Sequence, residues 1–327
     1  MAARTRYAPD RGLTVRMTAT LFLLGLVFVA FVALIIGIMT AAHASGASII
    51  LVAVIFGGGS AFISLFFSDK IALAAAGAQV VTPQQAPELH GIVDRLCALA
   101  DMPKPRVAIS PARMPNAFAT GRNSEHAVLC VTEGLLYHSQ LTQEELEGIL
   151  AHELSHVAHK DVQVMTYASL LAIVAGLLVR FAFYSELFGG GRRSNDSNAA
   201  LLIPLIMLAS AVVYAISFLL IRLLSRYREL AADRSGALLT QNPSALISAL
   251  TKVSKGMNLI PTQDLRAAEP LNAFYFAPAM KLSGGRGGGA SLSTLFSTHP
   301  SLDKRIEQLS KIQRELGQPG AEPRGLR

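Results

Sequence analysis

The amino-acid sequence predicts a mainly α membrane protein, with four transmembrane helices and an α+β domain on the cytoplasmic side. Hydrophobic residues make up 51% of the 327 residues and charged residues only 16%, far from the composition of an average soluble chain. The apolar residues gather in long uncharged runs, as transmembrane helices require. Between the runs lie polar stretches in which helix-like and strand-like patterns follow one another.

Charge and cysteine content exclude several protein classes. Lys and Arg outnumber Asp and Glu by 29 to 22, but the positive charges are scattered and form no dense basic stripe. We therefore expect no nucleic-acid partner. Cys97 and Cys130 lie in apolar surroundings without C-x-x-C spacing, which excludes a disulfide-rich secreted module and a thiolate metal site.

The first pair of spans lies in the uncharged run from Met17 to Ser68. A single helix of this length would be about 78 Å long, more than twice the hydrocarbon thickness. Small and polar residues at 43–46 break the run into spans near 17–42 and 47–67. Ala42-His43-Ala44 imitates a signal-peptide cleavage site, but the first run exceeds the roughly 7–15 apolar residues of a signal peptide and a second span follows it.

A second pair of spans is predicted near 162–183 and 199–221, joined by a short loop rich in Gly, Arg, Ser and Asn. Arg180 lies inside the third span, where its long side chain can extend to the interface. The predicted organisation is a hairpin at 1–68, the first part of the α+β domain at 69–161, a hairpin at 162–221 and the second part of the domain at 222–327.

Basic residues near the span ends are unequally distributed, which predicts the orientation. One side carries Arg180, Arg192 and Arg193. The other carries more: Arg4, Arg6, Arg11, Arg16, Lys70, Lys160, Arg222, Arg226 and Arg228. Because Lys and Arg favour the cytoplasmic side, we expect both termini and the α+β domain to be cytoplasmic.

The α+β domain should contain a small sheet. The pattern of Pro87–Ala100 indicates an amphipathic helix, and Arg106–Ser110 indicates a short strand. Two further strands, at Asn116–Thr120 and Ala127–Thr132, are joined by the polar turn Gly121–His126.

The residues that carry chemistry lie on a helix that begins with a capping box, Thr142 followed by Glu145. This helix contains His152-Glu153-Leu154-Ser155-His156. The i, i+4 spacing places two imidazoles on one helical face, with their Cβ atoms about 6 Å apart, where both can bind one tetrahedral zinc ion. Glu153 then faces the water that the metal would activate. Alternatively, the two histidines only lie at a polar interface before a membrane helix.

Glu229 is the best candidate for a third ligand. Val162 occupies the position of the third metzincin histidine, which excludes that subclass. His156 lies six residues before one apolar run and Glu229 eight residues after the other, so the two would lie about 9 Å and 12 Å above the membrane boundary. Asp233, one turn beyond Glu229, could accept the distal N–H of a ligand histidine. Alternatively, Glu229 and Asp233 only pair with neighbouring arginines on a solvated helix face.

At this point the chain resembles a known family. The His-Glu-x-x-His motif, a two-span hairpin and the Arg-Glu-x-x-Ala-Asp signature ending at Asp233 look like the HtpX-type membrane zinc endopeptidases, bacterial relatives of the prenyl-protein (CAAX) protease family. Agreement extends to Pro115–Gly121, to Asp161, and to Ser297-Thr298-His299-Pro300 followed by Arg305. The resemblance covers nearly the whole chain.

The resemblance implies a zincin-type (gluzincin) protease domain with one Zn²⁺ per subunit. The implied metal ligands are His152, His156 and Glu229. The implied catalytic residues are Glu153, as general base, and His299, as a donor to the oxyanion. The residues that support the ligands are Asp161, Asp233 and Arg305.

An edge strand that binds substrate backbone is implied at Asn116, Ala117 and Phe118. From the sequence alone this could equally be an ordinary strand, and His299 could equally cap a helix. His159 fits neither a third ligand nor the family pattern.

These features predict a membrane-integral zinc endopeptidase in the cytoplasmic membrane of a bacterium, which hydrolyses misfolded or damaged membrane proteins during quality control and stress response. Expected partners are the membrane, unfolded protein substrates and other quality-control proteases. Two alternatives stay open, a narrow peptidase that processes a lipidated or secreted precursor and a non-catalytic zinc-binding adaptor. Glu153 argues against the adaptor. A structural zinc site fills its four positions with ligands and has no need for an acid beside an open position.

Overall fold

The computed structural model describes residues 11–41, 62–63, 66–188, 197–259 and 299–317. The chain divides into two compact units. The α/β unit comprises residues 1–16, 66–163 and 225–327, and the helical unit comprises 17–65 and 164–224. The predicted break at 43–46 and most of the predicted span at 47–67 lie outside the described residues.

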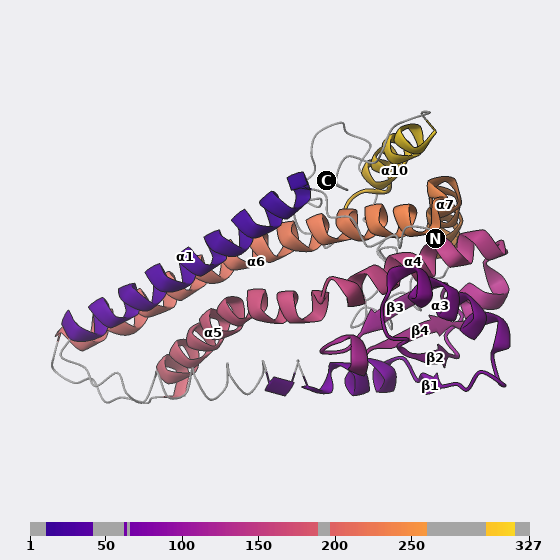
Figure 1. Cartoon of the computed structure of the whole chain (residues 1–327). Helices are drawn as coiled ribbons and strands as arrows, with labels where there is room; N and C mark the ends of the chain where they lie inside the picture. Colours follow the sequence, from indigo (N-terminus) through magenta and orange to yellow (C-terminus); the bar gives the residue numbers. More distant parts are fainter. Residues whose placement is uncertain (1–10, 42–61, 64–65, 189–196, 260–298, 318–327) are drawn as a thin grey trace. The chain divides into compact units, whose positions relative to one another are not determined.

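The helical unit contains most of α1 (Arg11–Ala41), most of α5 (Asp161–Phe188) and the first part of α6 (Ser197–Thr240) (Figure 1). Its core includes Phe31, Ala175 and Val213, one from each helix. Large apolar side chains also cover the outside, as Phe22 shows with 74% exposure. A helix that is apolar all round suits a hydrocarbon environment.

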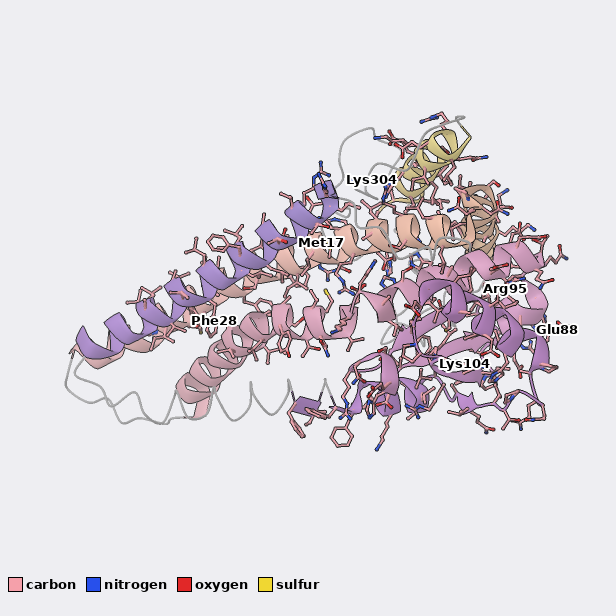
Figure 2. All side chains as sticks on the ribbon, in the orientation of Figure 1. Met17, Phe28, Glu88, Arg95, Lys104 and Lys304 are labelled. Carbon is pink, nitrogen blue, oxygen red and sulfur yellow. The ribbon has the colours of Figure 1, made fainter. Side chains whose placement is uncertain are left out.

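Two helices are long and apolar enough to cross a membrane, Arg11–Leu34 and Pro204–Thr240. The apolar part of α5, described as Asp161–Gly176, is shorter. The polarity of the two units differs clearly in Figure 2, where α1 carries Met17 and Phe28 while Glu88, Arg95 and Lys104 lie on the α/β unit. The structure therefore supports membrane residence through two described helices.

Helix α6 extends well beyond the predicted span at 199–221. It continues without interruption through 44 residues to Thr240, as the height estimate for Glu229 assumed, with Pro204 in its first turns. Arg222 follows the apolar segment, and its guanidinium lies 4.0 Å from the centroid of the Phe218 ring. One helix thus carries both the apolar segment and the predicted ligand Glu229.

The α/β unit contains a four-stranded sheet with the order β1-β2-β4-β3. The strands are β1 (Gln79–Val80), β2 (Arg106–Ser110), β3 (Ala117–Thr120) and β4 (Val128–Thr132). Strands β2 and β4 are parallel, and the other two pairs are antiparallel. The three strands expected from the sequence are present within one residue of their predicted ends. Strand β3 pairs only with β4, so it forms an edge of the sheet.

Helices α3 (Pro87–Ala100), α4 (Gln143–Ala158), α7 (Pro243–Leu259) and α10 (Leu302–Leu316) belong to the same unit. Their core residues include Leu96, Leu150, Leu246 and Leu309, which are fully buried with β-strand residues such as Leu129. Burying side chains of this size is the main stabilising contribution to such a unit.

The capping box that starts α4 is confirmed. Thr142 Oγ1 accepts from the Glu145 N–H, and Glu145 Oε2 accepts from the Thr142 N–H at 2.8 Å. The same carboxylate forms an ion pair with Lys252 of α7 at 2.7 Å. One acidic side chain therefore sets the start of α4 and holds α7 against it.

The connection between α4 and α5 differs from the prediction. Helix α4 ends at Ala158, Lys160 adopts the left-handed conformation with φ 56°, and α5 begins at Asp161. The expected height of about 9 Å for His156 assumed a continuous helix, so that estimate is wrong. The corresponding estimate for Glu229 is unaffected, because α6 is continuous.

Gly236 of α6 allows α6 to approach α4 closely. A Cβ atom at this position would lie 2.9 Å from the backbone nitrogen of His152 and 3.1 Å from its Cα. Cβ atoms in proteins essentially never approach another atom to less than 3.0 Å, so the contact of 2.9 Å would force a shift. The atoms in the way belong to the backbone of His152 and not to a flexible side chain. The absence of a side chain here therefore brings Glu229 and Asp233 within reach of α4.

We predict that Gly236→Ala destabilises the protein by about 1–3 kcal/mol, because the added methyl group forces two helices apart. Gly91→Ala is a matched control, since no atom lies within 4 Å of a Cβ at Gly91 of α3. That change should stabilise by about 0.5–1 kcal/mol through helix propensity. Denaturant unfolding of the detergent-solubilised protein measures both, and equal stability of the two variants would contradict the close approach.

Candidate active site

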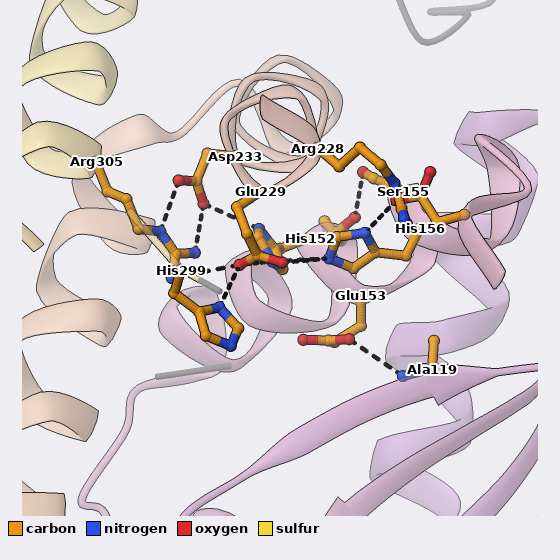
Figure 3. Close-up of polar contacts among 12 residues, drawn as sticks. Ala119, His152, Glu153, Ser155, His156, Arg228, Glu229, Asp233, His299 and Arg305 are labelled. Carbon is orange, nitrogen blue, oxygen red and sulfur yellow. Dashed lines mark hydrogen bonds and ion pairs between the residues drawn. The ribbon is translucent and has the colours of Figure 1, made fainter. Parts of the chain in front are cut away.

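Three predicted ligands converge from two helices of the α/β unit (Figure 3). The Nε2 atoms of His152 and His156 on α4 lie 3.2 Å apart. Glu229 of α6 places Oε1 3.5 Å from His156 Nε2 and Oε2 3.8 Å from His152 Nε2. One ligand atom from each residue lies within 4.8 Å of the others. The structure thus brings the sequence-predicted trio together.

The spacing of these atoms fits a zinc ion. Tetrahedral ligands about 2.1 Å from a metal are separated by about 3.4 Å, close to the observed 3.2, 3.5 and 3.8 Å. Both imidazoles turn Nδ1 toward a carboxylate, which leaves the two Nε2 atoms facing each other. Two imidazole nitrogens and a carboxylate oxygen that converge in this way form the donor set of a catalytic zinc site.

His156 is oriented by Asp161, the first residue of α5. The distance from Nδ1 to Asp161 Oδ2 is 2.5 Å, and Arg228 of α6 places Nη2 2.5 Å from the same oxygen. Burial alone would lower the pKa of His156, but the hydrogen bond and charge of Asp161, together with the charges of Glu229 and Glu153, raise it to about 9. The Asp161 carboxylate therefore fixes the orientation of the His156 ring.

His152 is oriented in the same way by Asp233 of α6. Its Nδ1 lies 2.9 Å from Asp233 Oδ1. Arg305 of α10 donates to both oxygens of this carboxylate, with distances of 2.7 Å from Nε and 2.6 Å from Nη2. All three side chains are buried. Each ligand histidine is thus held by a carboxylate that is itself held by an arginine.

Glu153 lies beside the ligands and faces β3. It is buried, and its Oε2 accepts a hydrogen bond of 3.1 Å from the backbone N–H of Ala119. Burial raises the pKa of Glu153 to about 8. A carboxyl group with a pKa near neutrality can both accept and return a proton during a reaction.

His299 joins the cluster through Glu229. Its Nδ1 lies 3.1 Å from Glu229 Oε2, and the side chain is buried. The alternative that His299 caps a helix is wrong, because the N-cap of α10 is Ser301, whose side chain accepts from the Lys304 N–H. The structure places His299 against the acidic ligand.

The predicted edge-strand residues do not all face the open edge. The carbonyl of Asn116 accepts from the Thr132 N–H, and the Asn116 N–H donates to Thr132 Oγ1. This pairing continues the register of β3 and β4, in which Ala117 lies opposite Val131. Because pairing alternates along an antiparallel ladder, Phe118 also directs its backbone to β4, whereas Ala117 and Ala119 direct theirs outward. Of the three predicted residues, Ala117 alone faces the open edge. Ala119, which the sequence analysis did not select, is its outward-facing neighbour.

Arg228 is a further residue that the sequence analysis missed. The sequence analysis counted it among the basic residues near the span ends and as a possible surface partner of Glu229 and Asp233, but it is 6% exposed and bound to Asp161. The solvated-face alternative is therefore wrong. The signal that could have identified Arg228 is its place as the first residue of the Arg-Glu-x-x-Ala-Asp signature. The unassigned His159 lies with Nε2 3.4 Å from Ser235 Oγ.

Residues 83–313 match the family model described as peptidase family M48. The chain is 55% identical over 318 residues to Protease HtpX homolog 1 of Streptomyces coelicolor, covering 97% of this chain and 98% of the relative. It is 47% identical to Protease HtpX homolog of Moorella thermoacetica, with coverage of 96% and 98%. The crystal structure of Ste24p of S. mikatae matches with a TM-score of 0.47 and 15% identity, over 92% of this chain and 66% of that chain.

The support of the ligand histidines can be tested with Asp161→Asn. Because the amide is a weaker acceptor for His156 Nδ1–H, zinc affinity should fall about 10–100-fold while the fold persists. Competition with a fluorescent chelator measures the affinity. The control Asp94→Asn removes a carboxylate that is bound to Lys104 on the surface and should leave zinc affinity unchanged. Equal affinities in the two variants would contradict the role of Asp161.

Proposed function

The chain belongs to peptidase family M48 and is a membrane metalloprotease, and we propose that it is a zinc endopeptidase acting on misfolded or damaged membrane proteins at the cytoplasmic face. The observation that carries this proposal is the convergence of His152, His156 and Glu229 beside a buried Glu153. Three protein ligands leave one tetrahedral position for the reaction, as in catalytic zinc sites.

His152, His156 and Glu229 would hold the metal, which when bound makes water a stronger acid and polarises a peptide carbonyl. Glu153 accepts the proton of the attacking water and returns it to the leaving amine. Its position beside the ligands and its pKa of about 8 suit both transfers. His299, held against Glu229, is the side chain placed to donate to the developing oxyanion.

Substrate recognition would use the open edge of β3. A peptide added as a further strand binds the outward backbone groups of Ala117 and Ala119, so its main chain matters more than its side chains. The Ala119 N–H is engaged by Glu153, and a bound peptide would replace that contact while Glu153 turns to the water. Recognition of this kind favours unfolded chains of varied sequence, as quality control and stress response require.

A narrow peptidase for one lipidated or secreted precursor is the second candidate within the same chemistry. Cleavage of a library of unrelated unfolded segments distinguishes the two, since only the quality-control enzyme cuts many of them. Other quality-control proteases of the membrane are proposed partners, because they would degrade the fragments further.

For the membrane arrangement we propose four spans, with both termini and the active site in the cytoplasm of a bacterium. The support is the length and apolarity of α1 and α6, the apolar start of α5 and the uncharged residues 47–67. The excess of Lys and Arg at one set of span ends supports the orientation.

The roles of Glu153 and Glu229 can be separated by two variants. Glu153→Gln should keep stoichiometric zinc but reduce hydrolysis of an unfolded protein by about 10²–10⁴-fold, because the proton acceptor is lost. Glu229→Gln should strip or greatly weaken zinc binding. Metal analysis and a proteolysis assay on the detergent-purified protein measure both quantities.

Glu144→Gln is the control for these variants, since Glu144 is an exposed residue on the first turn of α4. It should retain both zinc and activity. Undiminished proteolysis by Glu153→Gln would exclude Glu153 as the base. Tight, stoichiometric zinc in Glu229→Gln would exclude Glu229 from the ligand set.

The topology can be tested by single cysteines at positions 5, 125, 194 and 320. The native Cys97 and Cys130 are buried and should react slowly. Membrane-impermeant reagents should label position 194 from one side and the other three positions from the opposite side. Labelling of positions 125 and 194 from the same side would contradict the four-span arrangement.

A further inference from the structure

The hairpin loop that follows β3 contacts both points at which this part of the chain joins the helical unit. The α/β unit resumes at Phe66 and ends at Gln163 before the next helical segment. The Arg122 carbonyl accepts from Gln163 Nε2 at 2.5 Å, and the Arg122 guanidinium lies 5.0 Å from the centroid of the Phe66 ring. One end of the edge strand is therefore fixed where two apolar segments meet the α/β unit.

The side chains around this point have the character of a membrane interface. Phe66 and Phe67 are 44% and 41% exposed. Lys70 Nζ lies 5.5 Å from the centroid of the Phe67 ring. Exposed aromatic rings accompanied by cations are typical of the boundary between hydrocarbon and water. A lipid boundary at Phe66 and Phe67 would bring the Arg122 end of β3 close to it, because Arg122 contacts Phe66.

Two independent lengths relate the active site to that boundary. On α6, eight residues separate Ile221, at the end of the apolar run, from Glu229, which is a rise of about 12 Å. On the other route, Ala119 contacts Glu153 and lies three residues before Arg122, at most about 10 Å of extended chain. A substrate strand of about three to four residues covers either length.

We propose that the enzyme cleaves membrane-anchored substrates next to their anchor, at peptide bonds about three to six residues from the end of a transmembrane segment. The proposal rests on the proposed function and names its substrate class, the juxtamembrane segment of a membrane protein that has lost its fold. Such a segment can leave the bilayer beside Arg122 and extend along the open edge of β3 to the zinc ligands. A folded domain close to the membrane excludes the segment from this edge.

The test uses the full-length, zinc-loaded protein in liposomes with a single-span substrate. Its cytoplasmic side is an unstructured linker of about 30 residues made from one repeated dipeptide, so that bonds along the linker share a sequence context. Mass spectrometry maps the cuts. We expect cuts three to six residues from the span to outnumber those beyond ten residues at least tenfold. Insertion of four polar residues after the span should leave the preferred distance from the membrane unchanged.

Even cleavage along the linker, or cuts that move outward with the inserted residues, would overturn the proposal. A soluble unfolded protein in the same assay distinguishes this result from failure of the proposed function. If the soluble protein is cut and the linker is cut evenly, the peptidase assignment stands and the distance rule fails. If neither protein is cut by the wild type, the proposed function fails and the distance rule with it.

Gln163→Leu removes the side chain that holds the Arg122 carbonyl, and so tests Gln163 as a positioning residue. The cleavage window on the anchored substrate should widen by several residues, while hydrolysis of the soluble unfolded protein changes less than twofold. The control Gln84→Leu alters an exposed glutamine before α3 and should keep the narrow window. An unchanged window in Gln163→Leu would exclude the proposed role of this contact, and equal losses on both substrates would indicate a structural role only.

Discussion

The packing of α4 against α6 depends on a buried set of charges that must compensate one another. Asp161, Asp233 and Glu229 bring three carboxylates into a region that also holds the guanidinium groups of Arg228 and Arg305. Unpaired charges are costly to bury. The carboxylates that raise the pKa of His156 would also attract a divalent cation between His152, His156 and Glu229. Structural stability and metal binding are therefore coupled in this unit.

The same arrangement explains why the site uses segments so far apart in the sequence. Helix α4 provides the two imidazoles, α6 provides the third ligand and one supporting carboxylate, and α10 provides Arg305. Helices α4 and α10 both meet Asp233 of α6, through His152 and Arg305 respectively. Loss of one partner leaves the remaining charge buried, so these residues constrain one another. Gly236 permits the approach of the two helices on which these contacts depend.

The proposed substrate binding depends on a different property, the position of β3 at an edge of the sheet. A central strand has no free backbone groups, whereas β3 pairs on one side only and packs near α4. The contact between Ala119 and Glu153 joins the edge strand to the proton-transfer residue. In the proposed function, backbone recognition and hydrolysis are adjacent, and Gln163 holds the Arg122 carbonyl beyond the far end of the strand. The proposed distance between anchor and scissile bond rests on this arrangement.

Features encoded locally were predictable from the sequence alone. The start of α4 at Thr142, the strand ranges and the shared face of His152 and His156 follow from helix and strand periodicity within short segments. The membrane-height argument selected Glu229 and the resemblance supplied Arg305, because no local pattern assigns either residue. The structure alone decided that α4 ends before Lys160, that Arg228 binds Asp161, and that Ala119 faces outward instead of Phe118. These features depend on contacts between distant segments and on strand register, in which a shift of one residue reverses every side.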